Sequence, residues 1–104
     1  MGAVVEKLKN LHDVVEYHLT NDYRMRDDDN LLVATVWYNQ TKKKGYDPRH
    51  MTSFDFMQLY IKGQIATADA ITRVRRKLQE QHPPLRGSKW DERHTEANDV
   101  KYNY

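Results

Sequence analysis

The sequence predicts an all-α protein of four helices. Apolar residues recur every three or four positions through most of the chain, which is the spacing that lines one face of a helix. Glycine and proline stand between these stretches, where they end helices. The chain has 104 residues, of which 38% are hydrophobic and 31% charged, so we expect one modest core and one working surface.

The N-terminal half predicts two of the helices. Residues 3–19 form an amphipathic helix whose apolar face holds Val4, Leu8, Leu11, Val15 and Leu19. Residues 20–30 are too polar for the core, and one aspartate of residues 27–29 is expected to cap the next helix. Residues 31–42 then form a mostly buried helix with Trp37 as an anchor. Gly45 ends it, and the preceding lysines complement the negative C-terminal end of the helix dipole.

The third and fourth helices are joined by a tight turn. Residues 53–62 carry Phe54, Met57 and Ile61 at helical spacing, with Phe56, Leu59 and Tyr60 around them, so we expect this helix to be buried on most sides. Gly63 stands in the usual position of a left-handed cap, and Thr67 begins a last helix over residues 67–81, which Pro83-Pro84 ends. Two short helices in this order are typical of a helix-turn-helix.

The last helix carries four basic residues. Ile71, Val74 and Leu78 form a narrow apolar stripe that docks it on the core. The opposite side carries Thr72, Arg73 and Arg76 together with two acidic residues, and Arg75 and Lys77 flank the stripe and are expected to extend outward. In a major groove, such a helix would meet bases and phosphates, with backbone N–H groups at its start facing a phosphate. The candidate nucleic-acid-binding residues are Thr67, Thr72, Arg73, Arg75, Arg76, Lys77, Lys42, Lys43 and Lys44.

A structural reading of the same residues stays open. Asp69 and Arg73 are four residues apart, as are Arg76 and Glu80, so each couple can form a surface ion pair. The lysines at 42–44 have a sufficient role at the end of their helix. The basic helix is thus either a surface for DNA or a solvated, ion-paired face.

Charge is unevenly distributed along the chain. Residues 42–86 hold ten Lys or Arg against four Asp or Glu, whereas residues 1–41 hold four against seven and residues 87–104 hold three against four. An anionic partner would therefore be attracted to the middle of the chain. Charge of this size also serves solubility, so on its own it does not decide between the two interpretations.

Several classes of function lack their sequence signals. The chain has no cysteine, which excludes disulfides and thiolate metal sites and indicates a reducing, cytoplasmic location. No apolar run approaches a membrane span, so we expect no membrane partner. His12 and His18 are too widely spaced for helical metal ligands, and residues 27–29 lack the pattern of a calcium loop. With no phosphate-binding glycine loop or nucleophile motif, we expect no enzyme, cofactor or metal.

Residues 88–104 are interpreted separately from the helical domain at residues 1–87. Val100, Tyr102 and Tyr104 alternate as in a half-buried strand, so this segment is either the wing of a winged helix or a polar tail. Together with Trp90, its tyrosines also suit an interface hot spot.

Two stretches carry a resemblance to a recurring type of small bacteriophage protein. They are TNDYRMRDDDNLL at 20–32 and SFDFMQLYIKGQIATADAITRVRRKLQEQHPPLRG at 53–87, with an intervening helix that ends in a basic loop. The resemblance spans most of residues 1–87, and its most specific part is residues 71–87. Such proteins resemble helix-turn-helix or winged-helix proteins, which implies DNA binding but no single assigned activity. The resemblance implies a basic recognition helix with Arg73, Arg75, Arg76 and Lys77, docked through Ile71 and Leu78. It also implies the cytoplasm of a host cell. The chain departs from the type at residues 67–70, where Asp69 stands at the start of the helix.

The sequence thus predicts a protein that binds duplex DNA through residues 67–81 with help from residues 42–44. The alternative is a non-enzymatic interaction protein that binds and inhibits or recruits a host or phage protein. No heptad seam or exposed apolar helix predicts a dimer, although half-site recognition makes one compatible with this motif.

Overall fold

The computed structural model describes residues 10–90, and these residues fold into helices. In order along the chain they form α2 (Leu11–Asn21), α3 (Arg24–Asp27), α4 (Asp29–Lys43), α5 (Ser53–Ile61), α6 (Ala68–Gln81) and the short 3-10 helix η1 (Pro83–Leu85). The described part of the chain contains no strand, which confirms the all-α prediction there. The predicted wing at Val100, Tyr102 and Tyr104 lies outside the described residues.

Side-chain caps set the start of each longer helix. Asn10, Asp28, Thr52 and Thr67 each accept a hydrogen bond from the backbone N–H three residues later, at 2.8–3.1 Å. Each cap satisfies one of the amides that a helix start leaves unpaired. The predicted helix ends are confirmed as well, because Gly45 and Gly63 have φ angles of 94° and 70°. Only glycine adopts this left-handed backbone routinely.

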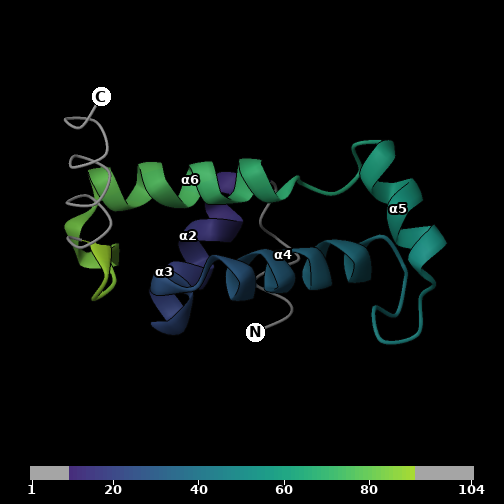
Figure 1. Ribbon diagram of the computed structural model, residues 1–104, viewed down its shortest axis with the longest axis horizontal. Coiled ribbons are helices and arrows are strands. Elements are labelled where there is room, and N and C mark those ends of the chain that lie inside the picture. Colours follow the sequence, from purple (N-terminus) through teal and green to yellow (C-terminus); the bar gives the residue numbers. More distant parts are fainter. Residues whose placement is uncertain (1–9, 91–104) are drawn as a thin grey trace, which may run out of the picture.

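The two longest helices lie alongside each other and run in opposite directions, and α2 crosses both of them (Figure 1). The main core lies where these three helices and α3 meet. Its buried members are Val15, Leu19, Met25, Leu32, Val33, Val36, Ile71 and Leu78. The predicted docking of α6 through Ile71 and Leu78 is therefore confirmed.

The segment at residues 20–30 contributes to this core, contrary to the sequence prediction. Its single turn of helix, α3, turns Met25 inward, and Arg26 is buried beside it. The guanidinium of Arg26 has partners, because its Nε–H donates to the carbonyl of Leu19 at 2.7 Å and its plane lies over the ring of Tyr23. A polar stretch can enter a core when its charged group finds partners of this kind.

The expectation that Phe54, Met57 and Ile61 are buried is wrong. Their exposed fractions are 64%, 52% and 75%. The helix α5 is attached by its opposite side, where Phe56 and Tyr60 stack edge-on against Trp37 of α4 at ring-centroid distances of 5.1 and 6.1 Å. The side of α5 that carries Phe56 and Tyr60 thus docks on α4, and the side that carries Phe54 faces solvent.

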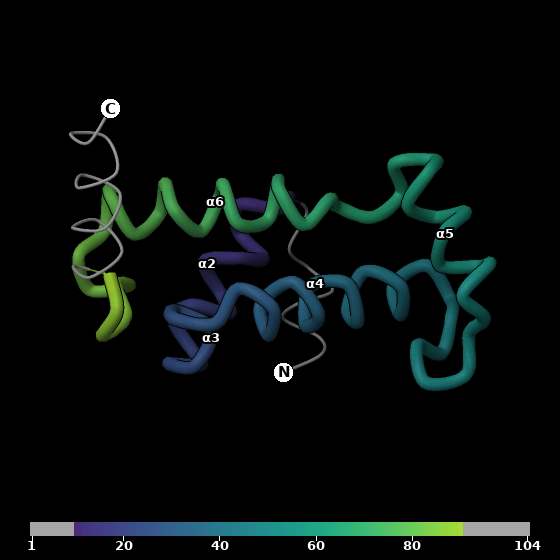
Figure 2. Tube along the Cα trace, viewed as in Figure 1, coloured from purple at the N-terminus to yellow at the C-terminus, as the bar shows by residue number. Residues whose placement is uncertain are grey.

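Two hydrogen bonds attach the connection between α5 and α6 to α4. The indole N–H of Trp37 donates to the carbonyl of Ala66 at 2.6 Å, and the N–H of Ala66 donates to Oε1 of Gln40 at 2.9 Å. Figure 2 shows the chain leaving α4, forming α5 at one end of the molecule and returning along α6. The helix α5 packs on α4, and α6 packs on α2 and α4. These contacts do not establish packing of α5 against α6, so the helix-turn-helix arrangement stays a prediction.

Burial of His18 makes stability depend on pH. The side chain of His18 is buried, with Nε2 3.3 Å from Nδ2 of Asn39. Burial lowers the pKa of His18 from its ordinary value of 6.5, and the charge of Asp22 only partly opposes this shift. The unfolded chain therefore binds a proton at a pH where the folded protein does not.

Above pH 6.5, His18 should not reduce the free energy of unfolding. As the pH falls below that value, the free energy of unfolding should decrease, and the effect of His18 should level off below its folded pKa. Urea unfolding at a series of pH values would measure this dependence. The variant His18→Gln should flatten it. An unchanged slope in His18→Gln would contradict the assignment.

Candidate nucleic-acid interface

The outward face of α6 carries three exposed basic side chains. Arg73, Arg76 and Lys77 are exposed, while Ile71 and Leu78 are fully buried on the side that faces the core. Arg73 forms an ion pair with Asp69, and both side chains are about three-quarters exposed. A pair this exposed contributes only about 0.3–0.5 kcal/mol, so Arg73 can exchange it for another anion at little cost.

Arg75 is inside the protein, which corrects the expectation that it extends outward. Its side chain is 7% exposed, and its Nε lies 2.8 Å from Oδ1 of Asp29 in the first turn of α4. A second guanidinium nitrogen donates to Oε1 of the fully buried Gln79 at 2.9 Å. Arg75 therefore ties α6 to α4 and is not available to a nucleic acid while the protein is folded.

The two threonines of the predicted set are engaged by their own helix. The hydroxyl of Thr67 accepts from the N–H of Ala70 at 3.0 Å, and that of the partly buried Thr72 donates to the carbonyl of Asp69 at 3.2 Å. Thr67 thus acts as the cap of α6. The exposed cations of α6 that remain from the predicted set are Arg73, Arg76 and Lys77.

The lysines at 42–44 are exposed, but the structure does not bring them together with these cations. They lie at the end of α4 and directly after it. In Figure 1 the last turn of α4 and the second half of α6 lie toward opposite ends of the molecule. One continuous basic face made of both groups is not present in the described part of the chain.

A buried amide network fixes the far end of α6. The side-chain N–H₂ of Gln79 donates to the carbonyls of Arg26 and Leu85, at 3.0 and 3.2 Å, and Nε of Arg86 donates to the carbonyl of Gln79 at 2.6 Å. Sequence reasoning missed Gln79. Its signal is its position, because at about 100° per residue Arg75 and Gln79 extend the apolar stripe of α6 on one side.

The segment that follows α6 contacts α3. The carboxylate of Asp27 accepts from the N–H and hydroxyl of Ser88 and from the N–H of Lys89, at 2.9–3.1 Å. A Cβ on Gly87 would lie under 3.0 Å from this carboxylate, which explains a glycine there. The guanidinium of Arg86 covers the ring of Trp90 at 3.8 Å. Residues 87–89 are thus held against the end of α3.

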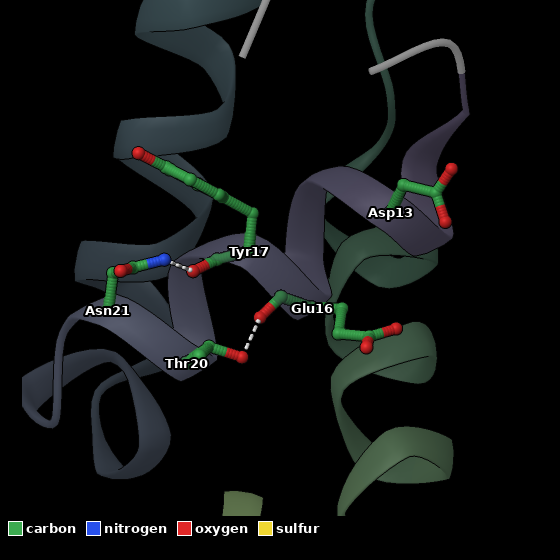
Figure 3. A pocket seen from close by; sticks show the side chains of 5 residues that line it. All are labelled: Asp13, Glu16, Tyr17, Thr20 and Asn21. Atoms are coloured by element: carbon green, nitrogen blue, oxygen red, sulfur yellow. Dashed lines mark hydrogen bonds between the residues drawn. The ribbon is translucent and has the colours of Figure 1, made fainter. Parts of the chain in front are cut away.

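An acidic recess of about 280 Å³ lies along α2 (Figure 3). The hydroxyl of Thr20 and the amide of Asn21 in its lining donate to carbonyls of their own helix. Figure 3 shows the carboxylates of Asp13 and Glu16 turned to one side of α2 and Tyr17 to the other. His12 lies close enough to both carboxylates to complete three metal ligands, but the three side chains are about half exposed. Exposed acidic groups of this kind do not by themselves define a metal site.

A groove of about 330 Å³ lies between α4 and the start of α6. Its lining includes two carboxylates, Asp29 and Asp69, and no basic side chain, so it offers no cation that would bind an anion. The first turn of α6 is therefore the less suitable part of the helix for a phosphate, and Arg76 and Lys77, further along, are the more suitable part.

Comparisons with known proteins add no relative. No family model matches the chain, no curated protein matches it, and no solved structure matches its fold. Within residues 10–90, none of the helices combines the length and the apolar character that a membrane span requires.

Proposed function

We propose that the protein binds duplex DNA through the exposed basic face of α6, formed by Arg73, Arg76 and Lys77. The observation that supports this is their arrangement on one side of a helix whose other side is buried. Arginine and lysine at such positions neutralise phosphates, and arginine can also pair with guanine. The bacteriophage resemblance and a helix-turn-helix type of docking remain parts of this proposal.

The surface is small, so the expected binding is weak and depends strongly on salt. Asp69 and Glu80 lie on the same helix and repel the DNA backbone, and Arg75 is removed from the set by burial. Three phosphate contacts give a slope of about −3 in a plot of log K against log salt concentration. A dissociation constant in the range of about 10⁻⁴–10⁻⁶ M is typical of binding dominated by phosphates. The lysines at 42–44 would contribute only where a longer duplex also reaches the end of α4.

The test is the double variant Arg73→Gln/Arg76→Gln, measured by fluorescence anisotropy with a labelled duplex at about 50 mM salt. We expect an affinity loss of about tenfold or more and a salt slope reduced by about 2. The matched control Lys42→Gln/Lys43→Gln removes the same charge from the end of α4 and should have a clearly smaller effect. Equal losses in both variants would indicate attraction by net charge alone, and an unchanged affinity in the first would overturn the proposal.

A second candidate function is that of a non-enzymatic interaction protein. The specific observation in its favour is the exposed apolar side of α5, at Phe54, Met57 and Ile61. A pull-down that survives nuclease treatment and is lost in Met57→Lys would support this function.

A further inference from the structure

The outer ridge of α5, formed by Phe54, Met57 and Ile61, is a large apolar surface exposed to solvent. Steps of three and four residues place the three side chains on one line along the helix. At about 100° per residue, this line lies opposite the side that carries the buried Leu59 and the docked Phe56. The ridge is therefore not the side that holds α5 to the rest of the protein.

The composition of α5 differs from that of a helix face adapted to water. Among its nine residues, only Asp55 is charged. The sequence of α6, by contrast, places Arg73, Arg76, Lys77 and Glu80 on its exposed side. Depletion of charge together with aromatic residues and methionine is typical of the core of a protein–protein interface. The ridge has the composition of an interface centre.

We propose that two copies of this chain associate through their outer ridges, with the two α5 helices antiparallel about a two-fold axis near Met57. This inference does not depend on DNA binding. A two-fold contact is self-complementary, so Phe54 of each copy would lie against Ile61 of the other and the two Met57 side chains would meet at the axis. One short helix can thus supply both sides of the contact.

Charge complementarity favours a second copy and the antiparallel orientation. Asp55 lies in the first turn of α5, and Lys62 is its C-cap residue. Antiparallel pairing brings the acidic end of each helix next to the basic end of the other, and it also opposes the two helix dipoles favourably. Parallel pairing would instead bring the two acidic ends together at one end of the contact and the two basic ends together at the other.

The position of α5 leaves room for such a partner, and its size sets the strength of the contact. In Figures 1 and 2, α5 stands at one end of the described fold, beyond the ends of α4 and α6. The ridge exposes on the order of 300 Å² of apolar side chain per copy, well below the roughly 800 Å² that each partner contributes to a standard interface. A contact of this size indicates a weak dimer that dissociates at low protein concentration.

Sedimentation velocity from about 10 to about 500 µM tests the association. The wild-type protein should shift from monomer to dimer over this range, and Met57→Lys should remain monomeric because it places two charges at the axis. Met57 is exposed, so this variant should keep the helical circular dichroism of the wild type. A wild-type protein that stays monomeric, or a Met57→Lys variant that still dimerises, would overturn the proposal and leave the ridge to a different protein.

Disulfide trapping tests the orientation, since the chain has no cysteine of its own. Under mild oxidation, a mixture of Phe54→Cys and Ile61→Cys should form a crosslinked dimer, whereas each variant alone should crosslink poorly. Efficient crosslinking of each variant with itself, and none between them, would indicate parallel helices and overturn the antiparallel arrangement. Neither result depends on whether the protein binds DNA.

Discussion

Replacing Arg75 with methionine is expected to lower the free energy of unfolding by about 2–4 kcal/mol. The substitution removes the ion pair to Asp29 and leaves the buried Oε1 of Gln79 without the donor that now lies 2.9 Å away. Asp29 is 38% exposed and can regain water, so the loss stays below that of a fully buried pair. Urea unfolding followed by circular dichroism would measure the change.

Arg76→Met is the matched control for this prediction. It changes the neighbouring residue in the same helix by the same chemistry, but Arg76 is exposed, so stability should change by less than about 0.5 kcal/mol. The effects on DNA should be reversed: Arg76→Met weakens binding, while Arg75→Met, at a temperature where it is folded, leaves binding nearly intact. Equal stability losses in the two variants would contradict the internal role of Arg75.

Replacing Trp37 with alanine is expected to lower the free energy of unfolding by about 2–4 kcal/mol and to loosen α5 in particular. The indole ring contacts the main core on one side and Phe56 and Tyr60 on the other, and its N–H holds the carbonyl of Ala66. Hydrogen exchange should therefore accelerate more at residues 53–61 than at the amides of α6.

Trp37→Phe separates the two contributions of the indole. The phenyl ring keeps much of the contact with Phe56 and Tyr60 but cannot donate to Ala66, so the expected loss is about 1 kcal/mol. Uniform acceleration of exchange across all helices in Trp37→Ala would show that α5 opens only with the whole fold. It would contradict the view of α5 as a unit attached mainly through Trp37.

Local chemistry allowed the helices of the described region to be predicted. Thr67 begins α6 and Gly45 and Gly63 end their helices because capping depends on residues within a few positions. The sequence also predicts the docking stripe at Ile71 and Leu78, since α6 has polar residues on its other sides. Where one face alone is apolar, periodicity identifies the buried side.

The errors arose where contacts distant in sequence decide the outcome. The helix α5 is apolar on most sides, so its periodicity could not show that the Phe56 side docks and the Phe54 side stays in water. The charge of Arg75 predicts a side chain exposed to solvent, but its partner Asp29 lies 46 residues earlier in the chain. Pairing over such a separation is set by the packing of α4 against α6, which a single sequence does not specify.

The hydrogen bonds between Asp27 and residues 88 and 89 attach the segment after Gly87 to α3. Ser88 and Lys89 supply three donors to the Asp27 carboxylate, and Trp90 lies beneath Arg86. A shortened protein prepared for crystallisation or NMR should therefore extend at least through Trp90. Ending it after Gly87 would remove residues 88–90, and with them the hydrogen bonds that hold the segment after α6 to α3.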